Sequence, residues 1–532
     1  MEATLLVFPI AALIGGWVAA LVRLPPMIGF LAAGFVLNGL GFDWVAPLGE
    51  IADLGVTLLL FTIGLKFDVR ILADKVVWAS TVVHMLLAVL IGLGFFVPLM
   101  LLNAPLLEDE SVSSLALISF GLSFSSTVFA MKLLQDRGQT RSFYGRVAVG
   151  ILVLQDLAAV VFLSLTNDTS PTWWALLLVL LVPASWLFRR IWDRIGHDEM
   201  QVLFGIVMAL VPGYALFTAV GLKGDLGALS MGLLLASHRS ASELSRTLFS
   251  LKELFLVGFF LELGLLSSLS WLSVVLAVGL LVMLPLQTLL YVGLLRMTGM
   301  RTRTAVRTGL LLMNFSEFGL IVIAVGTDTG ILDNDWLGIM AVAVGLSFAL
   351  ALVPNTKPGR LIARLEARLP DPPLAQLHPD DRPIEVGLAD AVVLGIGRIG
   401  RSAYDSLEQD YGLRVLGIDV DVQRVESVRA EGRNVVLGDA TDGDFWDRLN
   451  DTQTVGLAVL AMPFHGSNLE ALAWLRASDF AGTVAAVALY DDQRDEVKAA
   501  GADVVLQLYD GAGDGLAERA AELAGITRLD EQ

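Results

Sequence analysis

Apolar runs long enough to cross a lipid bilayer recur throughout the first two thirds of this chain. A membrane-spanning helix needs about 20 mainly apolar residues, and lipid offers no hydrogen-bond partners to a backbone that is not helical. Thirteen candidate runs lie near residues 4–22, 27–41, 47–66, 76–102, 112–135, 144–166, 172–189, 200–221, 225–238, 247–267, 271–295, 304–326 and 336–354. The sequence therefore predicts a polytopic α-helical membrane domain over residues 1–356.

The loops between these runs predict the orientation of the chain. Cytoplasmic loops of membrane proteins carry an excess of Lys and Arg. With thirteen spans, 18 of the 19 Lys and Arg residues before position 350 fall in one set of alternate loops, and only Lys223 falls in the other. We therefore expect the N-terminus outside and the C-terminal residues in the cytoplasm.

The last part of the chain has a different composition. The whole chain is only 17% charged, yet residues 351–532 hold 31 of its 54 acidic residues. Such an acidic region argues against nucleic acid as a partner. After a linker expected at 357–387, strand-like and helical segments alternate from 388 to 532, which predicts a parallel, Rossmann-like α/β domain. The expected strands are 391–394, 414–418, 434–437, 456–461 and 483–489.

A glycine motif begins this second domain. Gly395, Gly397 and Gly400 form a G-x-G-x-x-G pattern between a predicted strand and a predicted helix, which is the setting of a dinucleotide-binding turn. Asp419 ends the next strand, where an acid accepts a hydrogen bond from a ribose hydroxyl. The motif predicts nucleotide binding. We find no residue set for hydride transfer and expect a regulatory domain rather than an enzyme.

One acid lies in the middle of an apolar run. Asp156 follows Gln155 within residues 151–165, and a carboxylate at that depth is costly unless it serves a function. It is either a structural group held by hydrogen bonds or a carboxylate that alternately holds a proton and a metal cation. We favour the second interpretation.

Two polar segments predict interruptions of membrane helices. Residues 119–127 contain five hydroxyl side chains and Gly121, and residues 313–319 contain Asn314, Ser316 and Glu317. Freed carbonyls and hydroxyls at a helix break can coordinate an ion, and paired breaks in two halves of a chain are typical of transporters with inverted repeats. Two other polar residues each have two interpretations. Glu262 either lines an ion pathway or has a structural role, and His84 is either a buried structural histidine or a proton-binding group.

These motifs resemble those of the monovalent cation:proton antiporter-2 family, in particular its Kef-type potassium efflux members. Ser123–Thr127, Gln155-Asp156 and Ser316–Gly319 resemble the ion-site core of that family. The C-terminal region resembles its RCK/KTN (TrkA-N) domain, which includes Gly438–Thr441. Gln287 stands where many relatives have a basic residue.

The resemblance implies exchange of K⁺, or Na⁺, for H⁺ by alternating access in a homodimer of the inner cell membrane, with an ancillary regulatory subunit in some members. It implies a K⁺ site at Asp156, Ser125 and Thr127, with these residues nearby: Gln155, Ser123, Ser126, Ser316 and Glu317. It also implies regulation by an adenine nucleotide (AMP, NAD(H) or ATP) bound at Gly395, Gly397, Arg398, Gly400, Asp419, Asp439 and Ala440. The alternative is a nucleotide-gated potassium channel, but a TVGYG-like selectivity filter is absent from the sequence.

Overall fold

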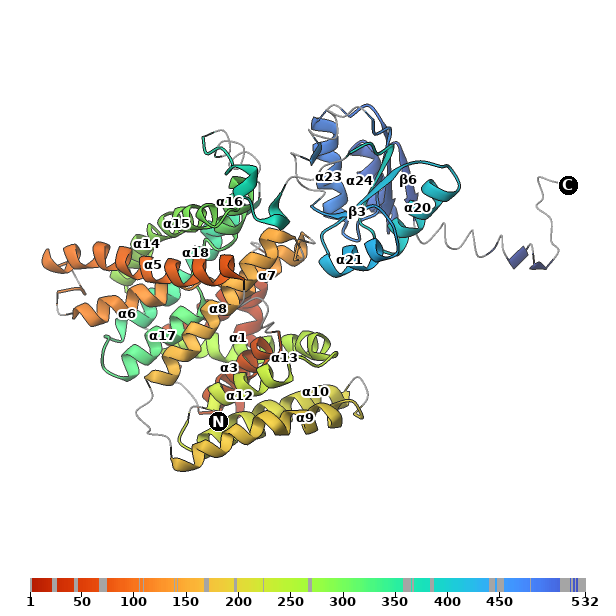
Figure 1. Cartoon of the computed structure of the whole chain (residues 1–532). Coiled ribbons are helices and arrows are strands. Elements are labelled where there is room, and N and C mark those ends of the chain that lie inside the picture. Colours follow the sequence, from red (N-terminus) through yellow and green to blue (C-terminus); the bar gives the residue numbers. More distant parts are fainter. Residues whose placement is uncertain are drawn as a thin grey trace. The chain divides into compact units, whose positions relative to one another are not determined.

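The computed structural model consists of two compact units (Figure 1). The first unit comprises residues 1–130, 147–298 and 305–371, and the second comprises residues 131–146, 299–304 and 372–532. The structure describes the chain except residues 1, 22–25, 43–45, 67–73, 105, 109, 138, 141, 167–171, 196–198, 223, 267–269, 357–364, 366–367, 383–386, 440–444, 447–453, 479, 508–516, 518–519, 522 and 525–532.

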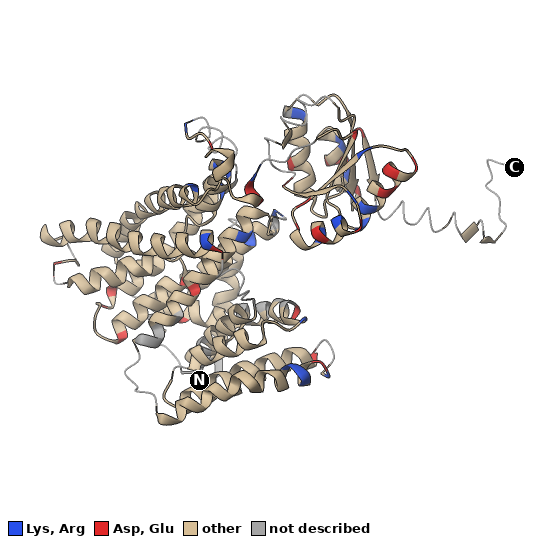
Figure 2. Ribbon diagram, in the orientation of Figure 1, with Lys and Arg blue, Asp and Glu red and all other residues tan. Residues whose placement is uncertain are grey.

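Helices make up the membrane body, and charged side chains are sparse along them (Figure 2). Its first half contains α1 (Glu2–Leu21), α2 (Pro26–Gly39), α3 (Ala46–Lys66), α5 (Lys75–Leu101), α6 (Val112–Leu122), α7 (Thr127–Asp136) and α8 (Phe143–Leu165). Its second half contains η1 (Trp173–Leu180), α9 (Leu181–Trp192), α10 (Glu199–Met208), η2 (Ala209–Ala215), α11 (Leu216–Ala219), α12 (Gly224–Leu235), α13 (Ala241–Leu266), α14 (Trp271–Leu280), α15 (Met283–Met297), α16 (Thr302–Leu311), α17 (Glu317–Asp328) and α18 (Asp335–Thr356).

These helices agree with the predicted class of fold. Among the described residues, six helical segments are long and apolar enough to cross a membrane, and five shorter apolar helices accompany them. The total of thirteen spans stays a prediction.

Small residues allow the helices of the first unit to pack closely. A Cβ atom on Gly64 of α3 would lie 2.4 Å from the carbonyl oxygen of Leu229 on α12, and one on Gly232 would lie 2.3 Å from the carbonyl oxygen of Phe61. Gly34 of α2 and Gly264 of α13 meet in the same way. Between membrane helices, packing contact is the main attraction, so such pairs of small residues fix the crossing points.

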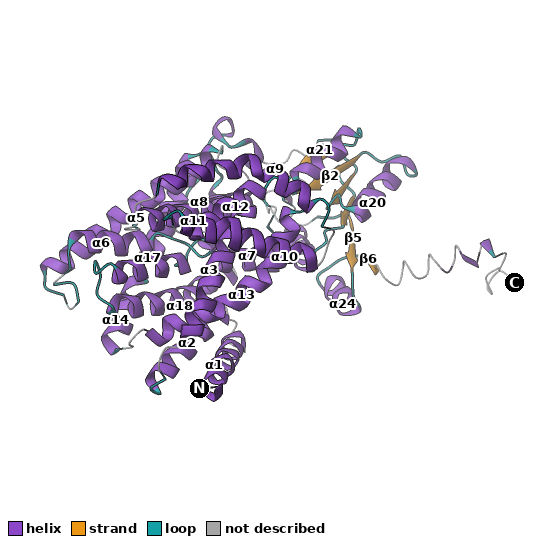
Figure 3. Ribbon diagram, turned by 90° about the horizontal axis from the view of Figure 1, so that it is seen from below, coloured by secondary structure: helices purple, strands orange, loops and turns teal. Residues whose placement is uncertain are grey.

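The α/β domain of the second unit contains a six-stranded parallel sheet (Figure 3). Its strands are β1 (Ala391–Leu394), β2 (Val415–Asp419), β3 (Val435–Leu437), β4 (Leu457–Leu460), β5 (Thr483–Ala488) and β6 (Val504–Gln507), in the order β3-β2-β1-β4-β5-β6. Its longer helices are α20 (Arg398–Gln409), α21 (Val422–Ala430), α23 (His465–Ala477) and α24 (Asp491–Ala499).

Alternate residues of the strands face two separate cores. Val392 and Leu394 join a cluster that contains Trp446, whereas Ala391 and Val393 join a cluster that contains Tyr404. Both faces are therefore covered, which explains why β1 reads as a continuous apolar run. This strand order is the doubly wound Rossmann order, and it places the end of β1 at the point where the order reverses. The strand β6 was not predicted, although its first three residues, Val504, Val505 and Leu506, are apolar.

Candidate functional site

Two membrane helices are broken where the sequence predicted polar interruptions. Helix α6 ends at Leu122 and α7 begins at Thr127, while α16 ends at Leu311 and α17 begins at Glu317. Ser316 caps α17, since its Oγ accepts a hydrogen bond from the backbone N–H of Phe318 at 3.1 Å. Each break leaves carbonyl groups at a helix C-terminus and N–H groups at a helix N-terminus that have no partner within their own helix.

The two breaks contact each other through side chains and backbone. Ser125 Oγ donates to the carbonyl oxygen of Leu312 at 2.9 Å, and the backbone N–H of Ser126 donates to Asn314 Oδ1 at 2.6 Å. Ser126 Oγ donates to Glu317 Oε2 at 3.0 Å. A Cβ atom on Gly319 would lie 2.4 Å from the carbonyl oxygen of Gly121, so α6 and α17 approach at backbone distance. The breaks are thus joined into one polar crossing.

Asp156 lies on α8 beside this crossing. Its side chain is 1% exposed, and its Oδ2 accepts a hydrogen bond from Thr127 Oγ1 at 3.0 Å. Thr127 is the first residue of α7, whose N-terminal dipole end favours negative charge. The carboxylate is therefore placed next to the Thr127 hydroxyl and next to the N-terminus of a half-helix.

Gln155 binds the first break through its amide. Gln155 Oε1 accepts from the backbone N–H of Ser125 at 3.0 Å, and Gln155 Nε2 donates to the carbonyl oxygen of Ser123 at 2.9 Å. Most of the predicted ion-site residues contribute side chains to this region: Ser125, Ser126, Thr127, Gln155, Asp156, Ser316 and Glu317. Ser123 contributes its carbonyl oxygen.

The ligand chemistry of the crossing suits a monovalent cation. Carboxylate, hydroxyl and carbonyl oxygens can replace the hydration shell of such an ion. Half-helix C-termini supply carbonyls for cations, while half-helix N-termini stabilise the acids that bind them. The side-chain oxygens come from α7, α8, α17 and the residues of both breaks.

Several residues of this region were not predicted as site residues. Asn314 joins the second break to Ser126, and Gln287 Nε2 donates to the carbonyl oxygen of Leu122 at 2.9 Å. Tyr291 accepts a hydrogen bond from Gln155 and stacks on His84. The sequence signal that could have indicated these residues is the pair Gln287 and Tyr291, two polar side chains four residues apart in the apolar run 271–295. Glu262 lies on α13.

The three motif glycines of the α/β domain have three different surroundings. Gly395 has φ +87°, and a Cβ atom there would lie 2.9 Å from the carbonyl oxygen of Ala461. A Cβ atom on Gly400 would lie 1.9 Å from the carbonyl oxygen of Gly395, which requires glycine for packing α20 against the turn. Gly397 has nothing within 4 Å of such an atom. The middle glycine therefore borders open space at the N-terminus of α20, where a phosphate group would approach.

Asp419 supports the glycine turn. Its side chain is buried, Oδ2 accepts from the backbone N–H of Ile396 at 2.8 Å, and Oδ1 accepts from the backbone N–H of Asp421 at 2.9 Å. Arg424 Nη1 also donates to Asp419 Oδ2 at 2.8 Å. Arg398 is exposed at the start of α20, Asp439 is half-buried, and Ala440 lies outside the described residues. Asp419 thus lies at the end of β2, as predicted, and its carboxylate also stabilises the glycine turn by accepting a backbone hydrogen bond.

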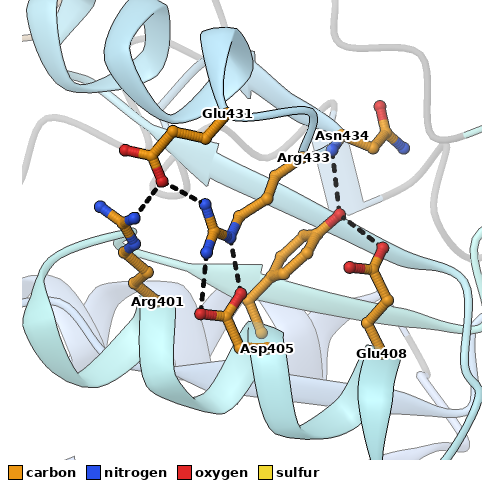
Figure 4. Close-up of polar contacts among 7 residues, drawn as sticks. Arg401, Asp405, Glu408, Glu431, Arg433 and Asn434 are labelled. Carbon is orange, nitrogen blue, oxygen red and sulfur yellow. Dashed lines mark hydrogen bonds and ion pairs between the residues drawn. The ribbon is translucent and has the colours of Figure 1, made fainter.

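A network of ion pairs fixes α20 to the segment before β3 (Figure 4). Arg433 pairs with Asp405 and Glu431, and Glu431 also pairs with Arg401. The Arg433 guanidinium lowers the pKa of the Asp405 carboxyl through its hydrogen bonds. Burial raises the pKa of Tyr404, whose hydroxyl accepts from the backbone N–H of Asn434 at 2.9 Å.

Within the second unit, the linker contacts the starts of two membrane helices. Asp380 pairs with Arg146 near the start of α8 at 2.8 Å. The buried Asp381 accepts from the backbone N–H of Arg301 and from Thr304 Oγ1, each at 2.6 Å. Arg146 also donates to the carbonyl oxygen of Val420, which follows Asp419, at 3.4 Å.

Comparison with known proteins identifies relatives of both parts of the chain. The K(+) efflux antiporter 1, chloroplastic, of Arabidopsis thaliana is 26% identical over 479 residues, which cover 83% of this chain and 39% of that protein. A putative K(+) efflux antiporter KefB of Alkalimonas amylolytica is 28% identical over 451 residues, covering 79% of this chain and 66% of that protein. The chain thus spans less than two thirds of the length of either relative. These relatives confirm the resemblance to Kef-type antiporters.

Among solved structures, the sodium proton antiporter MjNhaP1 from Methanocaldococcus jannaschii is similar, with 14% identity and a TM-score of 0.46, over 68% of this chain and 99% of that chain. Residues 391–508 match the TrkA-N domain, which confirms the Rossmann-like C-terminal domain. Residues 10–354, more than half of the chain, match the family described as sodium/hydrogen exchanger, transmembrane. The chain is a multi-pass membrane protein that belongs to the sodium/hydrogen exchanger family.

Proposed function

We propose that this protein exchanges K⁺, or Na⁺, for H⁺ by alternating access, with Asp156 as the shared carrier. The observation that supports this most strongly is the placement of the buried Asp156 carboxylate beside two crossed helix breaks. Thr127 Oγ1 donates directly to that carboxylate, and Ser125 Oγ lies at the contact between the two breaks. A cation that displaces the proton from Asp156 would be bound by the carboxylate together with hydroxyl oxygens of this region.

Exchange follows from competition for a single carboxylate. A bare carboxylate in lipid is costly, so Asp156 is stable with either a proton or a cation and disfavoured with neither. A carrier that crosses only in its two loaded forms couples the two flows one for one. Glu317 holds the two breaks together through Ser126, and we propose that it stabilises the crossing during this motion.

We further propose that an adenine nucleotide (AMP, NAD(H) or ATP) binds at the glycine turn and controls exchange. Open space at Gly397 and the strand order support the binding site. The linker contacts support the coupling, because Asp380 and Asp381 hold the starts of α8 and α16. Helix α8 carries Asp156, and α16 ends at the second break.

The proposed setting of the protein follows the resemblance to its family. We propose a homodimer in the inner cell membrane, with the N-terminus outside and the α/β domain in the cytoplasm. An ancillary regulatory subunit, as in some relatives, belongs to the same proposal. The one-sided distribution of loop Lys and Arg residues supports the orientation.

Reconstitution tests the proposal. The full chain in liposomes with an internal pH dye, at zero membrane voltage, is expected to move protons when K⁺ is added, and Asp156→Asn is expected to abolish this. Cation flux without protons would indicate a channel and contradict the proposal. Asp381→Asn is expected to keep nucleotide binding but to reduce the effect of nucleotide on exchange.

A further inference from the structure

Tyr291 is connected to the polar crossing through Gln155, although it does not itself lie in either helix break. It lies on α15 and is 1% exposed. Its hydroxyl oxygen accepts a hydrogen bond from Gln155 Nε2 at 2.8 Å. A buried tyrosine hydroxyl usually has a specific partner, and here the partner is the residue that precedes Asp156.

The hydrogen bonds of the Gln155 amide fix its orientation. Both hydrogens of Nε2 are used, one by the carbonyl oxygen of Ser123 and one by the hydroxyl of Tyr291. Oε1 faces the N–H of Ser125. A flipped amide would place its NH₂ group against that N–H and its oxygen against the Ser123 carbonyl. Gln155 therefore holds the non-helical backbone between Ser123 and Ser125 in place through one hydrogen bond at each end.

His84 fixes the ring of Tyr291 in turn. The two rings are stacked, with centroids 3.5 Å apart and planes 8° from parallel. His84 lies on α5 and is fully buried. One turn before Tyr291, Gln287 donates to the carbonyl oxygen of Leu122, the last residue of α6. Helix α15 thus bonds to the end of α6 through Gln287 and acts on the first break indirectly through Tyr291 and Gln155, and His84 of α5 supports the second of these connections.

We propose that Tyr291, held by His84, is a positioning residue for exchange. Through Gln155, its hydroxyl holds the Ser123–Ser125 backbone and thereby sets the positions of the Ser125 and Thr127 hydroxyl oxygens, the second of which bonds to Asp156. This inference rests on the proposed function, in which those oxygens bind the cation. Loss of the hydroxyl should weaken cation binding more than it slows the movement of the loaded carrier.

Tyr291→Phe tests this most cleanly, because the ring and its stacking partner remain. We expect the apparent KM for K⁺ to rise about tenfold, as for loss of one buried hydrogen bond, while kcat per folded protein changes less than about twofold. Tyr214→Phe, which removes a tyrosine hydroxyl from the η2 segment, is the matched control and should leave both constants unchanged. A purely structural role would lower the melting temperature and yield of folded protein without changing KM.

Two further variants sharpen the result. His84→Phe keeps an aromatic ring and should preserve KM, whereas His84→Ala should raise it as Tyr291→Phe does. In a Gln155→Leu background, Tyr291→Phe should have little additional effect on KM, because the two act as one unit. Additive effects, or an unchanged KM in Tyr291→Phe, would overturn the inference.

The outcomes separate this inference from the proposed function. If Asp156→Asn keeps full exchange, the proposed carrier is wrong whatever Tyr291 does. If Asp156→Asn abolishes exchange and Tyr291→Phe leaves KM unchanged, only the positioning role fails.

Discussion

The helix breaks of the membrane body and the ion pairs of the α/β domain use polar side chains in opposite ways. The side chains of Gln155, Ser126 and Asn314 are fully buried, and each bonds to backbone N–H or carbonyl groups at the breaks that a continuous helix would have paired. In the α/β domain, Arg401 and Glu431 are about 40% exposed and pair with other side chains. Water can replace a partner in the second case but not in the first.

This difference indicates where a single substitution matters. A buried polar group that loses its partner costs about 1–3 kcal/mol, whereas an exposed ion pair contributes about 0–1 kcal/mol. We therefore expect function to be sensitive at the breaks and tolerant at the ion pairs. The glycine turn is the exception within the α/β domain, because backbone contact rather than charge determines it.

The largest effect on stability is expected at that turn. Gly400→Ala places a Cβ atom 1.9 Å from the carbonyl oxygen of Gly395, and the resulting shift of α20 should cost about 3 kcal/mol, at the upper end for overpacking. Gly397→Ala meets open space and should change the free energy of unfolding by less than about 0.5 kcal/mol.

Calorimetry of the full chain checks this pair of variants. The melting transition of the α/β domain should fall in Gly400→Ala only, while binding of AMP or NADH should weaken in both. If Gly397→Ala binds both nucleotides normally, the phosphate does not approach this glycine.

A smaller loss is expected at the second break. Asn314→Leu removes the acceptor of the Ser126 N–H group, and this should cost about 2 kcal/mol and reduce exchange at least tenfold. Thr81→Val is the control, because Thr81 Oγ1 only donates back to the carbonyl oxygen of Val77 in its own helix. If the two variants have equal melting temperatures in detergent, a buried polar group at a helix break is no more important for stability than one inside a continuous helix, which would contradict this comparison.

The smallest effect is expected on acidification. The Arg414 guanidinium, through its hydrogen bonds, lowers the pKa of Asp390 to about 2, and Arg433 lowers that of Asp405. Because these pKa values are lower in the folded state, their contribution to stability is complete above the unfolded value of about 4 and is lost as pH falls below it.

The melting temperature of the α/β domain should therefore decline between about pH 4 and 2. Arg414→Met should flatten part of that decline. A pH dependence unchanged in this variant would show that the Asp390 pair contributes nothing measurable.

The sequence predicted elements that depend on local pattern. Apolar runs indicated the membrane helices, clusters of polar residues indicated both breaks, and the Gly395–Gly400 spacing indicated the turn after β1. It did not predict which groups meet across the breaks. The contacts of Asn314 with Ser126 and of Tyr291 with Gln155 join residues more than 130 positions apart, and no local period encodes such pairs.

Some predictions stay untested by the structure. The domain boundaries at 356 and 388, the roles of the ion-site and nucleotide-site residues, and the homodimer remain predictions. The strand β6 was missed although three of its four residues are apolar, and it pairs with β5 in the sheet. So short an apolar run does not distinguish a strand from a helix by its pattern alone.

The central claim is that one carboxylate holds either a proton or a cation. Calorimetric titration of the purified full chain with K⁺, in buffers of different ionisation enthalpy, counts the protons released for each K⁺ bound. We predict one proton released per K⁺ bound in the unchanged protein and neither binding nor release in Asp156→Asn. K⁺ binding without proton release, or binding that survives in Asp156→Asn, would contradict it.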